Sequence, residues 1–252
     1  MDDYRQWYDD DGITFHSEHK VQFSQADSSK RLSFFELLKV SSDMAVEDYA
    51  QQGLDRDTLT AHGYACLVSR VAFRFHRIPR ENERYVFTTY EEKPEPLQLV
   101  RAYEFAAPDG TPLVTGISSW LLVDPAAHRI IPTKKFDLRK PVETQKAHDC
   151  LKYGKIAVPE QLDACYERTI LYSDIDGNGH VNNARYGAFM ADAIPASLRG
   201  AAFTDFRLNY AKEAKLGETL RVFRHIDEDA KKMTVVGRTD GGTSFESELF
   251  WN

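Results

Sequence analysis

The densest group of chemically active side chains in the sequence lies at residues 173–183, which read Ser-Asp-Ile-Asp-Gly-Asn-Gly-His-Val-Asn-Asn. Two carboxylates, an imidazole and three amides are gathered in a turn that precedes a helical pattern. Such a set can bind a cation, activate water against an ester-like carbonyl, or cap the following helix. Glycines at 177 and 179 allow backbone amides to approach a ligand closely.

The cation hypothesis starts from Asp174, Asp176 and Asn178, which match the opening of an EF-hand loop. That loop needs a bidentate glutamate at its twelfth position, because calcium takes six to eight oxygen ligands. The twelfth position here is Arg185, a cation. We therefore expect no metal at this turn.

Helix capping and catalysis remain as alternatives. Asn182 or Asn183 can cap the helix, and Asp174 is favourable near its positive end, but capping leaves His180 unexplained. In the catalytic interpretation, donors at the helix start polarise a carbonyl while a carboxylate or imidazole activates water. No serine or cysteine lies in the turn, and Gly-x-Ser-x-Gly is absent from the sequence, which argues against a serine-triad hydrolase.

The elements that position this turn occur twice. Residues 21–27 and 170–176 both form a short alternating strand that leads into a Ser-x-x-Asp turn. The first copy continues into a helix announced by Ser33 and Glu36, a capping-box spacing, with Gly53 as its stop. The second has apolar residues at 186, 189, 190, 193 and 194, the stripe of a helix that ends before Pro195.

After each helix the pattern changes to strands. Alternation at 70–76 and 205–210 predicts strands, Asp-Gly pairs at 109–110 and 240–241 predict hairpins, and each copy ends in a strand with a tryptophan, Trp120 or Trp251. We predict an α+β protein of two tandem repeats, each with one helix against a curled antiparallel sheet. The repeats span 13–132 and 163–252, with a linker at 133–162. A single α+β domain with chance similarity is the alternative.

Composition limits the partners. The 252 residues are 42% apolar and carry a net charge of −7, which argues against nucleic acid. No apolar run is long enough to span a membrane, and the first twelve residues lack a secretory pattern. Three widely spaced cysteines predict neither a disulfide framework nor a cysteine zinc site, so we expect a cytoplasmic protein.

One basic series stands out from the acidic background. It is a solvated strand face or a docking surface for an acidic partner. Its members are Arg70, Arg74, Arg77, Arg80 and Arg84.

Residues 172–186, Tyr-Ser-Asp-Ile-Asp-Gly-Asn-Gly-His-Val-Asn-Asn-Ala-Arg-Tyr, closely resemble the signature of hotdog-fold thioesterases. Two such repeats in one chain, with Asp176, Asn178 and His180 in the second, resemble the acyl-acyl carrier protein thioesterases. The resemblance implies a tandem hotdog fold and hydrolysis of fatty acyl-acyl carrier protein, which releases a free fatty acid and ends chain elongation in fatty acid biosynthesis. It implies no cofactor, and a carrier protein with a phosphopantetheine-linked acyl chain as partner.

The resemblance also adds a fourth catalytic candidate. In the family a glutamate follows the second helix, a few residues past an aromatic, and Tyr210 and Glu213 fit this pattern. Plant members carry a cysteine directly afterwards, where this sequence has Ala214, so a cysteine nucleophile is excluded. Strand parity leaves the direction of Glu213 open, and a solvated strand-end charge is the alternative. The candidate catalytic set is Asp176, Asn178, His180 and Glu213.

The first repeat has Asp27-Ser28-Ser29 at the equivalent turn and no histidine, so it is the candidate acyl-chain pocket. For each apolar candidate, ordinary core is the competing interpretation. The candidate substrate-binding residues are Phe34, Leu37, Leu38, Phe73, Phe75, Asn182 and Asn183.

Three other functions stay open. An acyl-coenzyme A thioesterase of the 4-hydroxybenzoyl-coenzyme A type shares the Asp-x-Asp signature, although such chains are usually single hotdogs that dimerise. A hydratase of this fold fits poorly, because three residues separate Asp176 from His180, whereas that family usually has four between its Asp and His. The third is a non-catalytic acyl-binding module. Acyl chain length and the choice between monomer and homodimer are not predicted.

Overall fold

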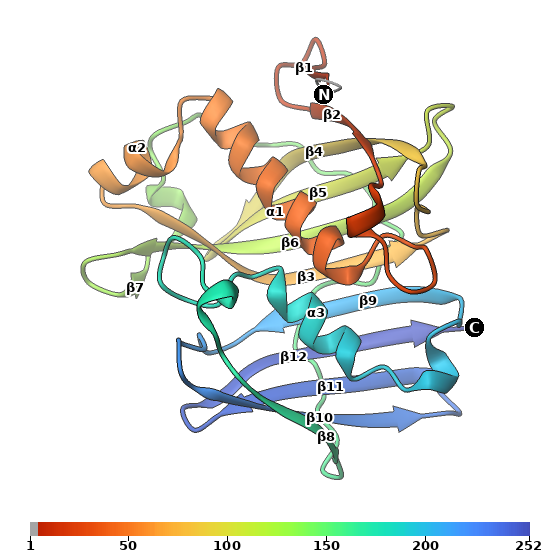
Figure 1. Ribbon diagram of the computed structural model, residues 1–252. Helices are drawn as coiled ribbons and strands as arrows, with labels where there is room; N and C mark the ends of the chain where they lie inside the picture. The colour runs from red at the N-terminus through yellow and green to blue at the C-terminus, as the bar shows by residue number, and fades with distance from the viewer. Residues whose placement is uncertain (1–4) are drawn as a thin grey trace.

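The computed structural model describes residues 5–252, which build one continuous antiparallel sheet (Figure 1). The described strands are β1 (Gln6–Tyr8), β2 (Phe15–Lys20), β3 (Ala65–Phe75), β4 (Arg84–Glu95), β5 (Gln98–Ala106), β6 (Pro112–Asp124), β7 (Arg129–Ile130), β8 (Asp163–Thr169), β9 (Phe203–Tyr210), β10 (Thr219–Asp227), β11 (Lys232–Thr239) and β12 (Gly242–Trp251). The α-helices are α1 (Phe34–Gln51), α2 (Arg56–Ala61) and α3 (Arg185–Asp192). Short 3-10 turns are η1 (Phe23–Gln25), η2 (Thr133–Lys135), η3 (Tyr172–Asp174) and η4 (Ala196–Leu198).

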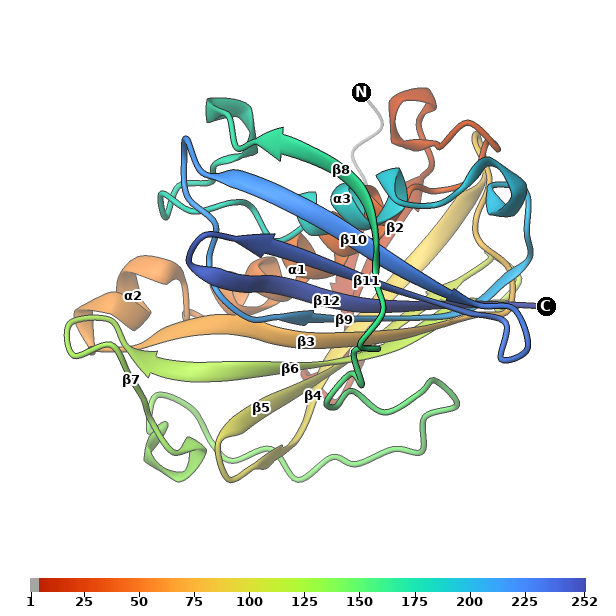
Figure 2. The same cartoon turned by 90° about the horizontal axis from the view of Figure 1, so that it is seen from below.

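The strand order shows the two predicted repeats. Strands β2-β4-β5-β6-β3 of the first repeat are followed in the sheet by β9-β12-β11-β10-β8 of the second, which is the same arrangement in reverse. β3 pairs with β9, and Phe73 lies opposite Phe206 in the register. Both long helices lie on one side of this sheet and contact each other (Figures 1 and 2). The predicted α+β tandem hotdog architecture is confirmed.

The first long helix begins and ends where its sequence predicts. The Ser33 hydroxyl accepts a hydrogen bond from the Glu36 backbone N–H at 3.3 Å. The Glu36 carboxylate accepts instead from Gln25 Nε2 at 3.2 Å, so only half of the capping box forms. Gly53 follows the helix with φ +77°, a conformation that favours glycine at a helix end.

The second long helix is shorter than its apolar stripe. α3 ends at Asp192, and Ile194 lies in the turn before Pro195 although its side chain is buried. Its close approach to α1 depends on Gly187, where an added Cβ would lie 2.6 Å from the Phe34 carbonyl oxygen. The two helices therefore cross almost backbone to backbone.

The two Asp-Gly hairpins form as predicted. Asp240 and Gly241 alone connect β11 to β12. Asp109 and Gly110 lie in a longer loop between β5 and β6, and Gly110 adopts φ +86°. Glycine adopts this positive φ at little energetic cost because it has no Cβ.

Residues 136–162 contain no described helix or strand and run along the sheet on the side away from the helices (Figure 2). The Asn209 side-chain amide donates to the Gly154 carbonyl at 2.9 Å. His76 and Asp149 lie 3.0 Å apart. These contacts hold the linker across the β3–β9 junction.

One hydrophobic core joins the repeats. The Phe34 ring packs against the rings of Phe75, Phe203 and Phe206, with centroids 6.0, 5.8 and 5.1 Å away. These aromatic contacts come from both repeats, so neither core is closed alone. Among residues 5–252, no helix has the length and apolarity needed to cross a membrane.

Candidate active site

The polar turn of the second repeat is a tight loop closed by a bridge between Ile175 and Val181. The Asp176 N–H donates to the His180 carbonyl at 2.9 Å. Gly179 takes φ +82°, which explains the need for glycine there. Opposite residues of an antiparallel pair project to the same side. The side chains of Asp176 and His180 therefore share one face of the turn.

The first repeat builds the same turn at residues 26–32. Asp27 and Arg31 are paired by a backbone hydrogen bond of 2.7 Å and take the places of Asp176 and His180. The Arg31 guanidinium lies 3.5 Å from the Asp27 carboxylate and donates to the carbonyls of residues 199 and 201. This turn thus forms a structural ion pair where the second repeat carries an imidazole.

Asp176 fixes the position of Asn178. One carboxylate oxygen of Asp176 accepts from the Asn178 backbone N–H at 2.8 Å. The other accepts from Asn178 Nδ2 at 3.3 Å. A side-chain amide nitrogen carries two hydrogens. The second N–H of Asn178 therefore stays available to a ligand.

Glu213 reaches His180 from the end of β9. Its carboxylate lies 3.0 Å from His180 Nε2. Glu213 follows the strand in a bend, which the Val181 N–H fastens by donating to the Ala214 carbonyl at 3.2 Å. In the tautomer that donates Nε2–H to Glu213, Nδ1 is an acceptor. Both side chains are partly open to water, with 35% and 52% exposure.

Asp174 takes no part in this face. Its carboxylate is fully buried and binds the guanidinium groups of Arg168 and Arg185 at 2.5 and 2.6 Å. Burial alone would raise the pKa of Asp174, but the Leu171 backbone N–H and the two arginines lower it. Asp174 is a structural anion, and its pairing with Arg185 leaves it unsuited to a cation site.

The predicted substrate-binding residues do not gather at one cavity. Asn182 Oδ1 accepts from the Ala184 N–H at 2.9 Å, and the Asn183 carbonyl accepts from the Tyr210 hydroxyl at 3.3 Å, so both brace the start of α3. The apolar candidates are core residues, and the void beside three of them is too small for water. They are Phe34, Leu37, Leu38, Phe73 and Phe75.

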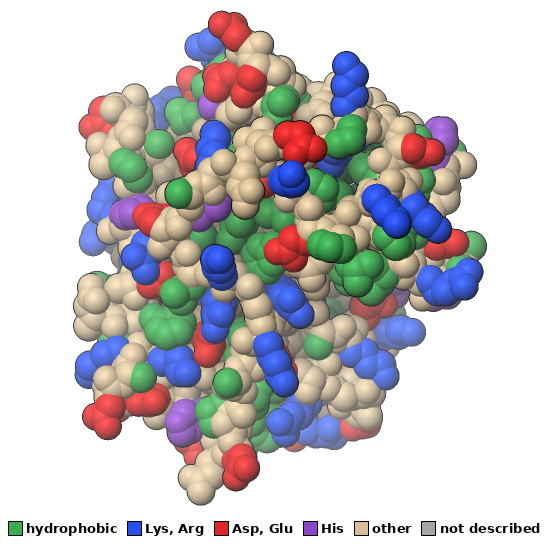
Figure 3. Space-filling view, turned by 180° about the vertical axis from the view of Figure 1, so that it is seen from behind, with side chains coloured by type: hydrophobic (Ala, Val, Ile, Leu, Met, Phe, Trp, Pro, Cys, Tyr) green, Lys and Arg blue, Asp and Glu red, His purple; other side chains and the backbone are tan. Residues whose placement is uncertain are grey.

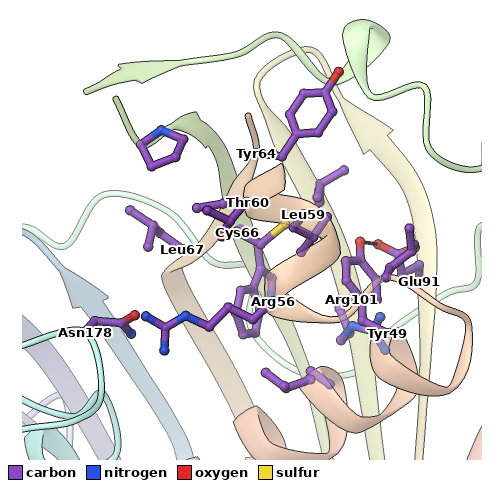
Figure 4. Close-up of a pocket in the computed structure, with 17 residues that line it drawn as sticks. Tyr49, Arg56, Leu59, Thr60, Tyr64, Cys66, Leu67, Glu91, Arg101 and Asn178 are labelled. Atoms are coloured by element: carbon purple, nitrogen blue, oxygen red, sulfur yellow. Dashed lines mark hydrogen bonds between the residues drawn. The ribbon is translucent and has the colours of Figure 1, made fainter. Parts of the chain in front are cut away.

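A cavity of about 380 Å³ lies elsewhere in the first repeat. Its walls come from the last turns of α1, from α2 and from the first residues of β3, with single side chains from the sheet behind. Asn178 is the one lining residue from the second repeat. Figure 4 shows Asn178 and Arg56 pointing toward one another on one side of the cavity, with Glu91 and Arg101 on the opposite side.

Sequence reasoning missed the charged residues of this cavity. Arg101 lines the cavity and is only 3% exposed. It lies on the same face of β5 as the buried residues Leu99 and Tyr103. Glu91 is likewise buried, on the inward parity of Phe87. A charge on the inward face of an apolar strand was the signal that marked them.

The cavity also holds a thiol that is not a nucleophile. Burial, and then the nearby Glu91 carboxylate, raise the pKa of Cys66 to about 12. The reactive form of a cysteine is the thiolate. Cys66 is therefore protonated at neutral pH and serves as a small apolar wall residue.

The structure separates the predicted docking arginines from the cavity. Arg74 binds Asp205 through two guanidinium nitrogens at 3.0 and 2.9 Å, and Arg77 lies 2.5 Å from Glu83. The series runs along β3 to the β3–β4 turn, whereas the cavity is lined by the opposite end of β3. From behind, basic side chains are interspersed with acidic ones (Figure 3).

Comparisons with known protein families and solved structures agree with this fold. Models of the acyl-ACP thioesterase N-terminal and C-terminal domains match residues 12–138 and 161–249. An acyl-ACP thioesterase structure from Bacteroides thetaiotaomicron is 21% identical with a TM-score of 0.83, covering 97% of this chain and 100% of that one. The 12:0-ACP thioesterase of Umbellularia californica is 16% identical with a TM-score of 0.75, covering 95% and 97%. No curated protein sequence matches the chain significantly.

At these identities the solved structures establish the fold alone. The two domain models carry the assignment, because between them they span both repeats and include the Asp176–His180 turn. The resemblance predicted from residues 172–186 is confirmed. The chain belongs to the acyl-acyl carrier protein thioesterase family of thioester hydrolases.

Proposed function

We propose that the protein hydrolyses the thioester between a fatty acyl chain and the phosphopantetheine arm of acyl carrier protein. The free fatty acid is released and chain elongation ends. The observation that supports this most is the position of Asn178, which lines the cavity of the first repeat and is held by Asp176 on the polar turn. An acyl chain in the cavity would bring its thioester to this turn.

The side chains of the turn suit general-base catalysis. The free N–H of Asn178 holds the thioester carbonyl oxygen and stabilises the negative charge that develops there. His180 Nδ1 takes a proton from water as the water oxygen attacks the carbonyl carbon. Glu213 stabilises the resulting imidazolium through Nε2, 3.0 Å away. The carbon–sulfur bond then breaks, and the imidazolium returns the proton to the departing pantetheine thiolate.

Asp176 acts as the orienting group in this mechanism. Both of its carboxylate oxygens accept hydrogen bonds from Asn178, so the carboxylate already holds the side chain proposed to bind the thioester oxygen. An acyl-enzyme on Asp176 is the competing mechanism. Asp176→Asn distinguishes them, because an orienting role predicts a partial loss of turnover and a nucleophile predicts none left above background.

The proposal is tested with matched C8 to C18 thioesters of acyl carrier protein and of coenzyme A. We expect hydrolysis of the carrier-protein series with the higher kcat/KM, and its loss in His180→Ala. Ser29 lies in the equivalent turn of the first repeat, where Arg31 has a structural role. Ser29→Ala is therefore the matched control and should retain activity. If the protein hydrolyses neither series, the proposal is contradicted. A preference for the coenzyme A series would change the substrate class.

A further inference from the structure

A cation of the first repeat lies beside the polar turn of the second. Arg56 begins α2 and lines the same cavity as Asn178. The two side chains point toward one another from opposite repeats (Figure 4). A Cβ added at Gly177 would lie 3.4 Å from Arg56 Nη1, which is ordinary contact distance. The guanidinium therefore reaches the backbone of the turn that carries the candidate catalytic side chains.

Arg56 has no anion of its own. Its side chain is exposed, and it makes no hydrogen bond or ion pair with any residue of the described chain. Arg168 and Arg185, the other arginines at this turn, both bind the buried Asp174 carboxylate. Both oxygens of Asp176 hold Asn178. The nitrogen donors of Arg56 are thus accessible and remain available to a ligand in the cavity.

We propose that Arg56 is a further catalytic residue, which donates to the thioester carbonyl oxygen together with the Asn178 amide. The inference rests on the proposed function and adds a second side-chain donor to its oxyanion site. As the water oxygen bonds to the carbonyl carbon, the carbonyl oxygen becomes negative. A cation placed there stabilises the transition state more than the neutral substrate. A guanidinium stays protonated, so Arg56 transfers no proton.

The position of Arg56 favours the thioester over the other anions of the substrate. The phosphate of the phosphopantetheine arm and the acidic carrier lie at the far end of the arm from the thioester. Arg56 instead adjoins Asn178, the side chain proposed to hold the thioester oxygen. A short thioester that lacks both phosphate and carrier separates the two roles.

The test compares kcat/KM for dodecanoyl-acyl carrier protein and for dodecanoyl-N-acetylcysteamine. In Arg56→Gln we expect both values to fall by about ten- to hundred-fold, less than for a buried oxyanion donor because solvent screens an exposed charge. Arg56→Lys, which keeps the charge, should lose less. Arg80→Gln, at an exposed arginine in the β3–β4 turn, is the matched control and should leave the short thioester unaffected. A loss confined to the carrier substrate, or no loss, overturns the inference while the proposed function stands.

A binding measurement separates this inference from hydrolysis itself. Dodecanoate carries a negative oxygen like the one that develops in the reaction, whereas dodecanamide is neutral. By calorimetry, Arg56→Gln should weaken dodecanoate about ten-fold and dodecanamide less than two-fold, as expected for loss of a hydrogen bond to a charged group. If the wild type hydrolyses no thioester but shows this difference, only the proposed function fails. Equal weakening of both ligands, or of neither, contradicts an anion site at Arg56.

Discussion

At the scale of single residues, the candidate site divides its work between two short side-chain contacts. Asp176 holds Asn178, and Glu213 holds His180. Each pair has one member that can meet the substrate and one that orients it. Because the turn is only five residues long, the two pairs lie beside each other on one face.

Asn178→Ala removes the side-chain donor to the thioester oxygen. We expect kcat to fall by about 10²–10³, as for other oxyanion donors, with a small change in KM. Steady-state kinetics on a medium-chain acyl carrier protein measures this, with Ser29→Ala as the control from the first-repeat turn. A variant within ten-fold of wild type would remove Asn178 from the oxyanion site.

Glu213→Gln keeps an acceptor for His180 Nε2 but removes the negative charge. Because the charge stabilises the imidazolium only during reaction, we expect kcat to fall by about 10- to 100-fold while KM stays near the wild-type value. Glu160→Gln, on the exposed linker, is the matched control. Unchanged kcat in Glu213→Gln would show that Glu213 is a solvated charge, the alternative stated from the sequence.

The sequence indicated these residues because the turn is local. Its glycines, carboxylates and amides are adjacent in the chain, and its helix follows directly. The direction of Glu213 was not predictable, because the residue lies beyond β9 in a bend where strand parity no longer applies. Arg101 and Glu91 were missed because their contacts come from strands and helices distant in sequence.

At the scale of elements, the crossing of α1 and α3 depends on Gly187. Gly187→Ala would place its Cβ 2.6 Å from the Phe34 carbonyl oxygen, a backbone atom that cannot rotate away. We expect the free energy of unfolding to fall by about 1–3 kcal/mol, as for other overpacked sites. Urea denaturation measures it. Gly154→Ala, where a Cβ meets open space, should change little, and an equally stable Gly187→Ala would contradict this helix contact.

Strand β2 gives the fold a pH dependence. Burial lowers the pKa of His19 to about 4, below its ordinary value of 6.5. The unfolded chain therefore binds a proton that the folded chain does not, so stability is complete above pH 6.5 and falls between pH 6.5 and 4. In His19→Gln the loss of unfolding free energy between pH 7 and 5 should be smaller than in wild type. An identical loss in both proteins would contradict this assignment.

At the scale of the whole molecule, the sheet arrangement makes the two repeats interdependent. The sequence predicted two similar units because each carries the same order of strand, turn, helix and strands. It did not show that β3 and β9 join them edge to edge, because period-two alternation identifies a strand but not its neighbour. The sequence also did not show that the predicted docking arginines and the cavity lie at opposite ends of β3, because composition does not tell which end of a strand borders a cavity.

The pairing of β3 with β9 also bears on the roles proposed for the two repeats. It brings the Asn178 turn of the second repeat to the cavity of the first. A single repeat would have either the polar turn or the cavity, but not both.

Since the cavity borders α2, we expect the carrier protein to approach near Arg56 rather than at Arg80. Arg56→Glu should raise KM for the carrier-linked substrate, whereas Arg80→Glu should leave it unchanged. The reverse result would support the docking surface predicted from the sequence.

We propose that the first repeat holds the acyl chain while the second cleaves its thioester. The most direct measurement is the C8 to C18 profile of kcat/KM on acyl carrier protein for the wild type, Ala45→Leu and His180→Ala. Ala45 lines the cavity, so its enlargement should shift the profile toward shorter chains. His180→Ala should lower every chain length by a similar factor. An unshifted profile in Ala45→Leu, or a wild-type protein that cleaves no chain length, would contradict the account.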